Sequence, residues 1–329
     1  MNKIQRTCFA IAALVACGGA SAQAAGYISQ TGSNDQASID QTSPAGTLSV
    51  SNIYQSGGAN NVVTVLQANN VAGPAPGGIV GAYNSLTQQA TIGDTAKVTQ
   101  INAGVGSTVV MTQSNGSNSQ VDLLQAGVSG AQMNINQSGD NHSQMVQQTA
   151  GTLGGFIRTG QTGSGSTMIV LQGQPSGGGV TNTQARVFQN GSANTAVSMQ
   201  AGGINNNTFV TQGGFTSPGY YYANSAGGYV EVDRTISGGL TTNSSATVYQ
   251  TGGMNQTAYI LQYGTALSGT IIQAGDGNLS GILQTGSSDT AYINQSGIAG
   301  NATVSQKGTG LNATISQGGA GNRATVTQR

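Results

Sequence analysis

The chain has 329 residues, of which 53 are glycine and only 5% are charged, and its formal net charge is zero. Its nine basic residues are scattered singly, which argues against a nucleic-acid-binding protein, because such a protein needs a concentrated basic patch. A chain with so little charge and hydrophobicity is expected to be disordered unless its sequence repeats at a regular interval. Whether such a repeat is present therefore decides between disorder and a repeat fold.

The N-terminus has the three parts of a secretory signal peptide. Lys3 and Arg6 precede the short apolar run CFAIAALVAC, and the following AQAAG offers a cleavage site after Ala24. The apolar run is too short to span a bilayer as a helix. The sequence therefore predicts an exported protein with a signal peptide over residues 1–24 and a mature chain over residues 25–329.

Both cysteines lie inside this predicted signal peptide. The mature chain is therefore expected to have no disulfide and no thiolate metal site. A second processing route stays open, because Leu14-Val15-Ala16-Cys17 resembles a lipoprotein box, which would leave a lipidated Cys17 as the first residue.

A short phrase that ends in glutamine recurs through the predicted mature chain. The last eight units follow one another at steps of 11 or 12 residues, and the earlier units are less regular, which gives about 23 in all. The later units end at Gln250, Gln262, Gln273, Gln284, Gln295, Gln306, Gln317 and Gln328. The earlier units end at Gln30, Gln41, Gln55, Gln67, Gln89, Gln100, Gln113, Gln125, Gln137, Gln148, Gln161, Gln172, Gln189, Gln200 and Gln212.

Within a unit, small, aliphatic and glutamine residues stand at every second position. In the last three units the small residues are Ala302, Ala313 and Ala324, and the aliphatic residues are Val304, Ile315 and Val326. This alternation predicts a strand with these side chains on its inward face. Turns are expected at the glycines two positions after each glutamine, Gly252, Gly264, Gly275, Gly286, Gly297, Gly308 and Gly319.

Two such strands and their turns make one flattened coil of about 22 residues. Coils stacked at ~4.8 Å would place each glutamine above the next, so that the buried amides satisfy one another as a ladder. The sequence therefore predicts an all-β fold, a β-solenoid of strand-turn-strand coils built from 11-residue half-repeats. The last unit runs to Arg329 with no capping helix, so we expect open sheet edges that add a further subunit head to tail.

Two segments interrupt the period and are expected to be loops on the column. The first covers residues 68–87, with Pro74 and Pro76, and the second covers residues 213–245, with Pro218 and the tyrosines Tyr220-Tyr221-Tyr222. The tyrosine cluster has two interpretations: it packs on the flank of the column, or it forms a surface patch for a partner.

The phrase N-x-A-x-V-x-Q-x-G resembles the repeats of the curlin family, the subunits of the bacterial functional amyloid called curli. Asn322-Arg323-Ala324-Thr325-Val326-Thr327-Gln328 fits this form at every position, and Gln273, Gly275 and Asn278 fit its Q-x-G-x-x-N half. The resemblance covers most of the predicted mature chain. The chain departs from the family in size, because it has about twice the usual number of repeats.

The resemblance implies a bacterial fibre protein of the cell surface. Such a protein would leave the cell through the curli outer-membrane secretion pore and its accessory proteins, and would polymerise with itself and other curlin subunits into extracellular fibres, or fimbriae. These fibres would serve adhesion and the biofilm matrix. The basic residues Lys307, Arg323 and Arg329 and the short leader AAGYISQ are closer to the minor, nucleating subunit than to the major one. Whether the chain is a fibre subunit or a nucleator stays open.

Other functions have less support in the sequence. His142 is the single histidine, in the turn-like GDNHSQ, and the carboxylate pair Glu231 and Asp233 would be a weak basis for a glycosidase. We therefore expect no enzyme, no metal or other cofactor, and no small-molecule substrate or nucleic acid. A monomeric solenoid adhesin is one alternative. An ice-binding solenoid is another, because Thr303, Thr314 and Thr325 recur at one outward position.

Overall fold

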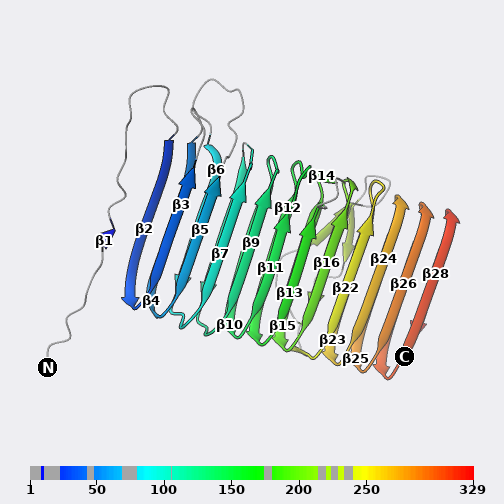
Figure 1. Ribbon diagram of the computed structural model, residues 1–329. Helices are drawn as coiled ribbons and strands as arrows, with labels where there is room; N and C mark the ends of the chain where they lie inside the picture. Colours follow the sequence, from blue (N-terminus) through cyan, green and yellow to red (C-terminus); the bar gives the residue numbers. More distant parts are fainter. Residues whose placement is uncertain are drawn as a thin grey trace.

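In the computed structural model, the chain forms a long, flat column of stacked strands (Figure 1). The structure describes residues 9–10, 23–42, 48–68, 80–104, 106–173, 180–213, 220–223, 229–232 and 240–329. These residues contain strands and turns and no helix, so none of them forms a helix that could cross a membrane.

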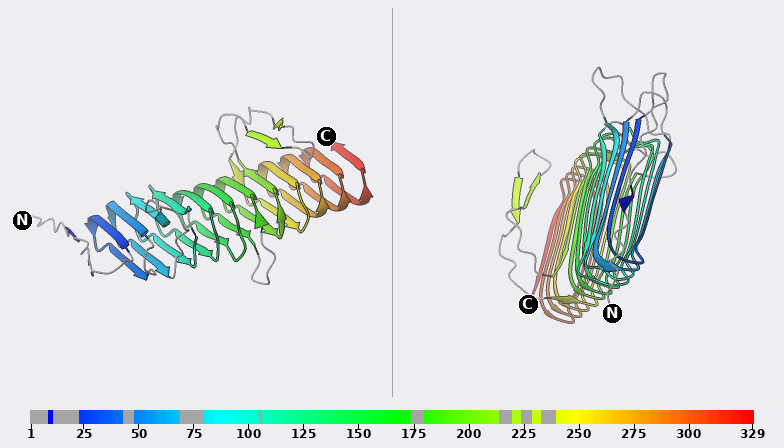
Figure 2. Two further views of the ribbon diagram at one scale, coloured as in Figure 1. Left: turned by 90° about the horizontal axis from the view of Figure 1, so that it is seen from above. Right: turned by 90° about the vertical axis from the view of Figure 1, so that its left-hand side faces the viewer.

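The strands form two parallel sheets, and consecutive strands alternate between them (Figure 2). The strands of sheet A are β2 (Gln23–Ser33), β4 (Leu48–Ala59), β6 (Val80–Gln89), β8 (Ser107–Ser114), β10 (Gln132–Asp140), β12 (Phe156–Ser164), β15 (Gln184–Ser192), β18 (Asn207–Gln212), β23 (Thr257–Thr265), β25 (Leu279–Ser287), β27 (Asn301–Thr309) and β29 (Arg323–Gln328), in that spatial order. The strands of sheet B are β3 (Gln36–Thr42), β5 (Val62–Ala68), β7 (Thr95–Ile101), β9 (Gln120–Ala126), β11 (Ser143–Gln148), β13 (Thr167–Gln172), β16 (Thr195–Ala201), β22 (Ser245–Thr251), β24 (Ser268–Asp276), β26 (Thr290–Ile298) and β28 (Asn312–Ala320).

This arrangement confirms the predicted β-solenoid. Each coil contains one strand of sheet A and one of sheet B, and paired strands near the C-terminus keep a spacing of 22 residues, as between Gln284 and Gln306. Upstream coils are longer, for example 24 residues between Gln113 and Gln137 and 28 between Gln161 and Gln189. The parallel pairing nevertheless keeps each glutamine opposite a glutamine, so the extra residues are accommodated outside the strands.

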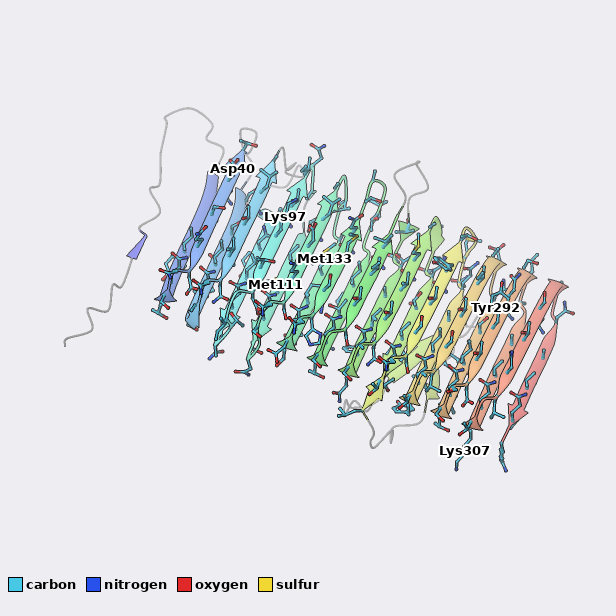
Figure 3. The ribbon with its side chains drawn as sticks, turned by 60° about the horizontal axis from the view of Figure 1, so that its bottom comes forward. Asp40, Lys97, Met111, Met133, Tyr292 and Lys307 are labelled. Carbon is cyan, nitrogen blue, oxygen red and sulfur yellow. The ribbon has the colours of Figure 1, made fainter. Side chains whose placement is uncertain are left out.

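The core lies between the two sheets and consists of small and aliphatic side chains. It runs continuously from Ile53 in β4 to Ile315 in β28. Met111 and Met133 are fully buried within it (Figure 3). Every second residue of a strand faces this core, as the burial pattern of β26, with buried Ala291, Ile293 and Gln295, illustrates. The period of two in the sequence therefore describes the inward face of each strand.

The first interruption is shorter than the sequence predicted. β6 begins at Val80, and its residues pair in register with β4 and β8, so residues 80–87 belong to a strand rather than to a loop. The rung glutamine of this strand is Gln88, which pairs with Gln55 and Gln113, whereas Gln89 is exposed. The prediction of Gln89 was therefore wrong by one residue, because two consecutive glutamines fit the phrase equally well.

The second interruption contains structure of its own. After β18 ends at Gln212, residues 220–223 (β19, Tyr220–Ala223) pair antiparallel with residues 229–232 (β20, Tyr229–Val232), and the chain rejoins sheet A at β21 (Thr241–Thr242). Figure 2 shows the hairpin of β19 and β20 beside the column. The loop prediction for residues 213–245 was therefore wrong for these strands and for the first residue of β22. Of the tyrosine cluster, the structure describes the backbone alone.

The outer face of sheet A carries a buried apolar cluster near this second interruption. Phe188, Phe209 and Leu261 point away from the core, yet their side chains are only 3%, 4% and 4% exposed. Tyr259, Tyr263 and Leu283, which are partly buried, pack against this cluster.

Two short strand pairs complete the fold. At one narrow edge of the column, β14 (Val180–Thr181) pairs with β17 (Gly203–Ile204). At the N-terminal end, β1 (Phe9–Ala10) pairs antiparallel with Ser29 and Ile28 of β2. β2 itself begins at Gln23, so the predicted cleavage site after Ala24 lies within its first residues.

Candidate self-assembly site

The glutamines of sheet A form a continuous ladder of side-chain amides. In each rung the amide Nε2 donates to Oε1 of the glutamine in the next coil, at 2.5 to 3.0 Å from Gln30 through to Gln328. Every second one of the eight later glutamines belongs to this ladder, namely Gln262, Gln284, Gln306 and Gln328. One donated and one accepted bond per rung satisfy groups that would be costly to bury alone.

Sheet B carries a second ladder with the same direction. It begins with Gln41, which donates to Gln67, and it ends with Gln317, with distances of 2.6 to 3.2 Å from Gln67 onward. Gln250, Gln273, Gln295 and Gln317 belong to this ladder. Successive glutamines of the sequence therefore lie in different columns, because one coil contains two units.

The two ladders are tied together through the backbone. The Nε2 of Gln306 in sheet A also donates to the carbonyl oxygen of Thr290 in sheet B at 3.0 Å, and Gln273 in sheet B donates to the carbonyl oxygen of Thr257 in sheet A at 3.0 Å. These two amides therefore use both of their protons, one along the column and one across it. In both ladders the N–H that bonds to the next glutamine points toward the C-terminal end of the column.

The last rungs are more exposed than the rungs inside the column. Ala302 and Val304 in β27 are fully buried, and Ala313 and Ile315 in β28 are 5% exposed. Ala324, Val326 and Gln328 in β29 are partly exposed, as is Gln317. β29 reaches one rung beyond β28. Beyond β29 and β28 neither sheet has a further strand among the described residues, so these two strands present their edges.

Apart from Gly252, which follows the end of β22, the predicted turn glycines lie inside strands, two residues before the turns. Six of the seven have a positive φ: Gly252, Gly264, Gly275, Gly286, Gly297 and Gly319. A Cβ on Gly286 would lie 1.8 Å from the carbonyl oxygen of Gly308 in the next coil. The glycines therefore permit close stacking of the strand ends, whereas the positive-φ residue of the turn itself comes later, as with Ala266, Ser288 and Ala299.

A third ladder, which the sequence analysis missed, runs along the corner between sheet A and sheet B. Six positions before each sheet B glutamine from Gln41 to Gln250, a polar side chain accepts a hydrogen bond from the backbone N–H at the same position of the next coil; Leu267 and Leu311 take this position before Gln273 and Gln317. The residues in this corner ladder include Asp35, Asn61, Asp94, Ser119, His142, Ser166, Asn194 and Ser244. The Asn of the N-x-A phrase is the sequence signal that could have revealed this ladder.

His142, which lies between β10 and β11, is a buried member of this corner ladder. Its Nδ1 accepts from the N–H of Ser166 at 3.3 Å, and its Nε2 lies 3.2 Å from the carbonyl oxygen of Ser138. Both contacts are satisfied by the neutral ring with its proton on Nε2. Burial lowers the pKa of His142 from 6.5. The unfolded chain therefore binds a proton at His142 more tightly than the folded chain does. As a result, His142 reduces the free energy of unfolding as the pH falls below about 6.5.

Asp94 is the second titrating member of the corner ladder. Its Oδ1 accepts from the N–H of Ser119 at 2.9 Å, and burial raises its pKa from 3.8 to about 6. The folded chain therefore binds this proton more tightly than the unfolded chain does. The free energy of unfolding therefore falls as the pH rises from about 4 through about 6 and Asp94 ionises. At neutral pH the whole of this reduction is present.

Replacing Asp94 with Asn is expected to stabilise the column at pH 8. Asn61 and Asn194 occupy the same corner position, so an amide fits there and accepts the same bond without a charge. We expect a gain on the order of 1 to 3 kcal/mol in the free energy of unfolding at pH 8 and almost none at pH 4. Urea denaturation at both pH values measures this. The exposed Asp122→Asn is the control, and equal midpoints for D94N and the natural chain at pH 8 would contradict it.

The outward threonines do not form one row. Thr303 pairs with Thr325 in sheet A, whereas Thr314 lies in sheet B opposite Tyr292. The two groups are therefore on opposite faces of the column. In sheet A the row stops at Gly281, because a Cβ there would lie 2.0 Å from the ring of Tyr259. The column has no extended threonine face in this region, which removes the observation behind the ice-binding alternative.

The regular C-terminal coils match a known family. The family model described as "Curlin associated repeat" matches residues 264–297 and 301–329. These two stretches of the chain are curlin repeats. No curated protein matches the chain. The matched curlin repeats run from the end of β23 to Arg329 and are the coils that keep the 22-residue period.

The curlin repeats and the less regular coils share one architecture. The glutamine ladders pass from the matched region into the upstream coils without a break, as the bonds from Gln212 to Gln262 and from Gln200 to Gln250 show. The upstream units therefore have the geometry of the matched repeats although their spacing differs. Within the described residues, no group of three or more His, Cys, Asp or Glu side chains is placed to hold a metal ion.

Proposed function

We propose that this curlin-repeat protein is a structural subunit that assembles head to tail into extracellular fibres. The observation that carries the proposal is the shared direction of the two glutamine ladders. At the C-terminal end the last amide of sheet A, Gln328, would donate to a further rung, and at the other end of the same ladder Gln30 would accept. The two ends are therefore complementary, and stacking them repeats a contact that the column already makes.

Head-to-tail addition would begin in sheet A, where β29 extends one rung beyond β28. The partly exposed Ala324, Val326 and Gln328 would be buried against the first strand of the next subunit. Each backbone pair and each amide rung would contribute about 1 kcal/mol net, and the burial of apolar surface would add to this. Because such contacts do not close on themselves, the product is a filament.

Export fits the same proposal. Signal-peptide cleavage after Ala24 would remove β1 and with it the antiparallel pairing on the outer edge of β2. The N-terminal edge of sheet A would then be open to β29 of another subunit. In this account the protein is secreted to the bacterial surface through the curli pore. There it contributes to adhesion and the biofilm matrix together with other curlin subunits, either as a fibre subunit or as a nucleator.

A fibre assay on the mature chain, residues 25–329, tests the proposal. We expect thioflavin fluorescence to rise with time, fibres to be visible by electron microscopy, and a meridional reflection at about 4.7 Å. A mature chain that stays monomeric and does not bind the dye over several days would overturn the fibre proposal. That result would instead favour a monomeric solenoid adhesin.

A further inference from the structure

The outer face of sheet B carries no charge over most of its length. From β11 to β28 the strands of this sheet contain no Lys, Arg, His or Glu, and Asp276 is their single Asp, at the corner where β24 ends. Asp40 and Lys97 lie in the N-terminal strands of the same sheet (Figure 3), and Asp122 lies there too, in β9. Soluble proteins normally place charges on such faces to prevent association.

The middle of this uncharged face is apolar. Outward-facing side chains at paired positions of neighbouring strands form two adjacent rows across β11 to β24. Most of the apolar side chains in these rows are partly exposed, and Met145 is the most exposed of them, at 41%. The apolar members of these rows, called here the sheet B stripe, are Met145, Ile169, Leu171, Val197, Met199, Tyr249 and Ile272.

Sheet A differs from sheet B both in the charge of its outer face and in the burial of its outward apolar side chains. Its outer face carries Arg158, Arg186, Lys307 and Arg323, and the ring of Phe188 lies 5.8 Å from the Arg158 guanidinium. The apolar cluster around Phe188 is buried, next to the point where the hairpin segment leaves the column. By contrast, every side chain of the sheet B stripe is at least partly exposed.

We propose that the sheet B stripe is a lateral interface that pairs with the same stripe on a second copy of this chain. A flat sheet with a rung every ~4.8 Å fits best against another sheet with the same repeat, because every rung then meets a rung at a sheet separation of about 10 Å. A partner without that period would match few rungs. The proposal is independent of the head-to-tail contact, although a filament would extend the same face along its length.

The area is sufficient for a stable pair. The whole uncharged face from β11 to β28, of which the sheet B stripe is the apolar middle, has seven strands at ~4.8 Å and five residues at ~3.3 Å. It measures roughly 34 by 17 Å, so two copies that pair over this face would bury on the order of 1,100 Å². This is above the ~1,000 Å² that separates specific interfaces from adventitious contacts. The absence of charge means that no desolvated ion opposes the contact.

Ile169→Lys tests the pairing. Lys97 occupies the same outward row in β7, so the row accepts a lysine without loss of fold. The matched control is Val110→Lys, because Val110 is an outward apolar residue of sheet A and is 38% exposed. Mass per length, measured on fibres by scanning transmission electron microscopy, distinguishes one column from two.

We expect fibres of the natural chain and of V110K to have twice the mass per length of a single column, and fibres of I169K to have half that value. Single-column fibres of the natural chain, or unchanged pairing in I169K, would overturn the lateral interface. If no fibres form, the proposed function fails, and sedimentation then decides this inference separately. A dimer that I169K dissociates would support it, and a monomer would refute it.

Discussion

Replacing Gln317 and Gln328 together with Ala is expected to slow fibre elongation at least tenfold while the column stays folded. Each glutamine is the last of its ladder and is partly exposed, so the isolated column loses few bonds. These are the bond from Gln295 to Gln317, the bond from Gln306 to Gln328, and the bond that Gln328 donates to the carbonyl oxygen of Asn312. At a junction the same substitution would also leave an amide of the next subunit buried without a donor, at a cost of about 1 to 3 kcal/mol. Each 1.4 kcal/mol is a tenfold change in an equilibrium constant.

The control for this variant is Thr314→Ala. Thr314 lies in β28 between the inward-facing Ala313 and Ile315, but its own side chain points outward and is exposed. Elongation kinetics measured with seeds of the natural chain, together with circular dichroism of the soluble variants, separate assembly from folding. Equal slowing by T314A and by Q317A/Q328A would mean that the inward and outward faces do not differ in assembly.

Gly286→Ala is expected to be among the most destabilising single changes in the curlin repeats. Gly286 has a φ of 137°, and an added Cβ would lie 1.8 Å from the carbonyl oxygen of Gly308, which is backbone of the next coil and has no freedom to rotate away. Strained backbone and the displaced rung together are expected to reduce the free energy of unfolding by about 3 kcal/mol or more. Thermal or urea denaturation of the soluble chain measures the loss.

Gly308→Ala is the matched control, one rung further in the same row. Gly308 does not have a positive φ, and the atom nearest to its added Cβ is the flexible Leu311 side chain at 3.2 Å. We expect G308A to cost less than about 1 kcal/mol. Similar losses for G286A and G308A would show that the glycines serve the turn in general and that close stacking is not their role.

The inward face of the fold was predictable because it repeats with two independent periods. Alternation of small, aliphatic and glutamine residues gives the strand face, and the 11-residue step gives the half-coil, so stacking follows from satisfying the buried amides. The same information does not separate Gln88 from Gln89, since both fit the phrase and the pairing with Gln55 decides between them. Local sequence likewise could not show that residues 80–87 continue the sheet.

The outer faces and the corners were harder to predict because their chemistry depends on which units share a sheet. Once the 22-residue coil is known, every second unit falls on the same side. The uncharged strands of sheet B then separate from the strands of sheet A that hold Arg158, Arg186 and Arg323. The corner ladder needed the same step, because Asp94 and His142 look like ordinary turn residues until they are aligned six positions before Gln100 and Gln148.

The junction between subunits gives the most direct test of head-to-tail assembly. Fibres grown from a mixture of ¹⁵N-labelled and ¹³C-labelled mature chains can be measured by solid-state NMR for contacts that join different subunits. The ladder direction predicts a contact between the side-chain nitrogen of Gln328 in one subunit and the side-chain carbonyl carbon of Gln30 in the next. Fibres that lack this contact and instead join β29 to β29, or β2 to β2, would contradict the account.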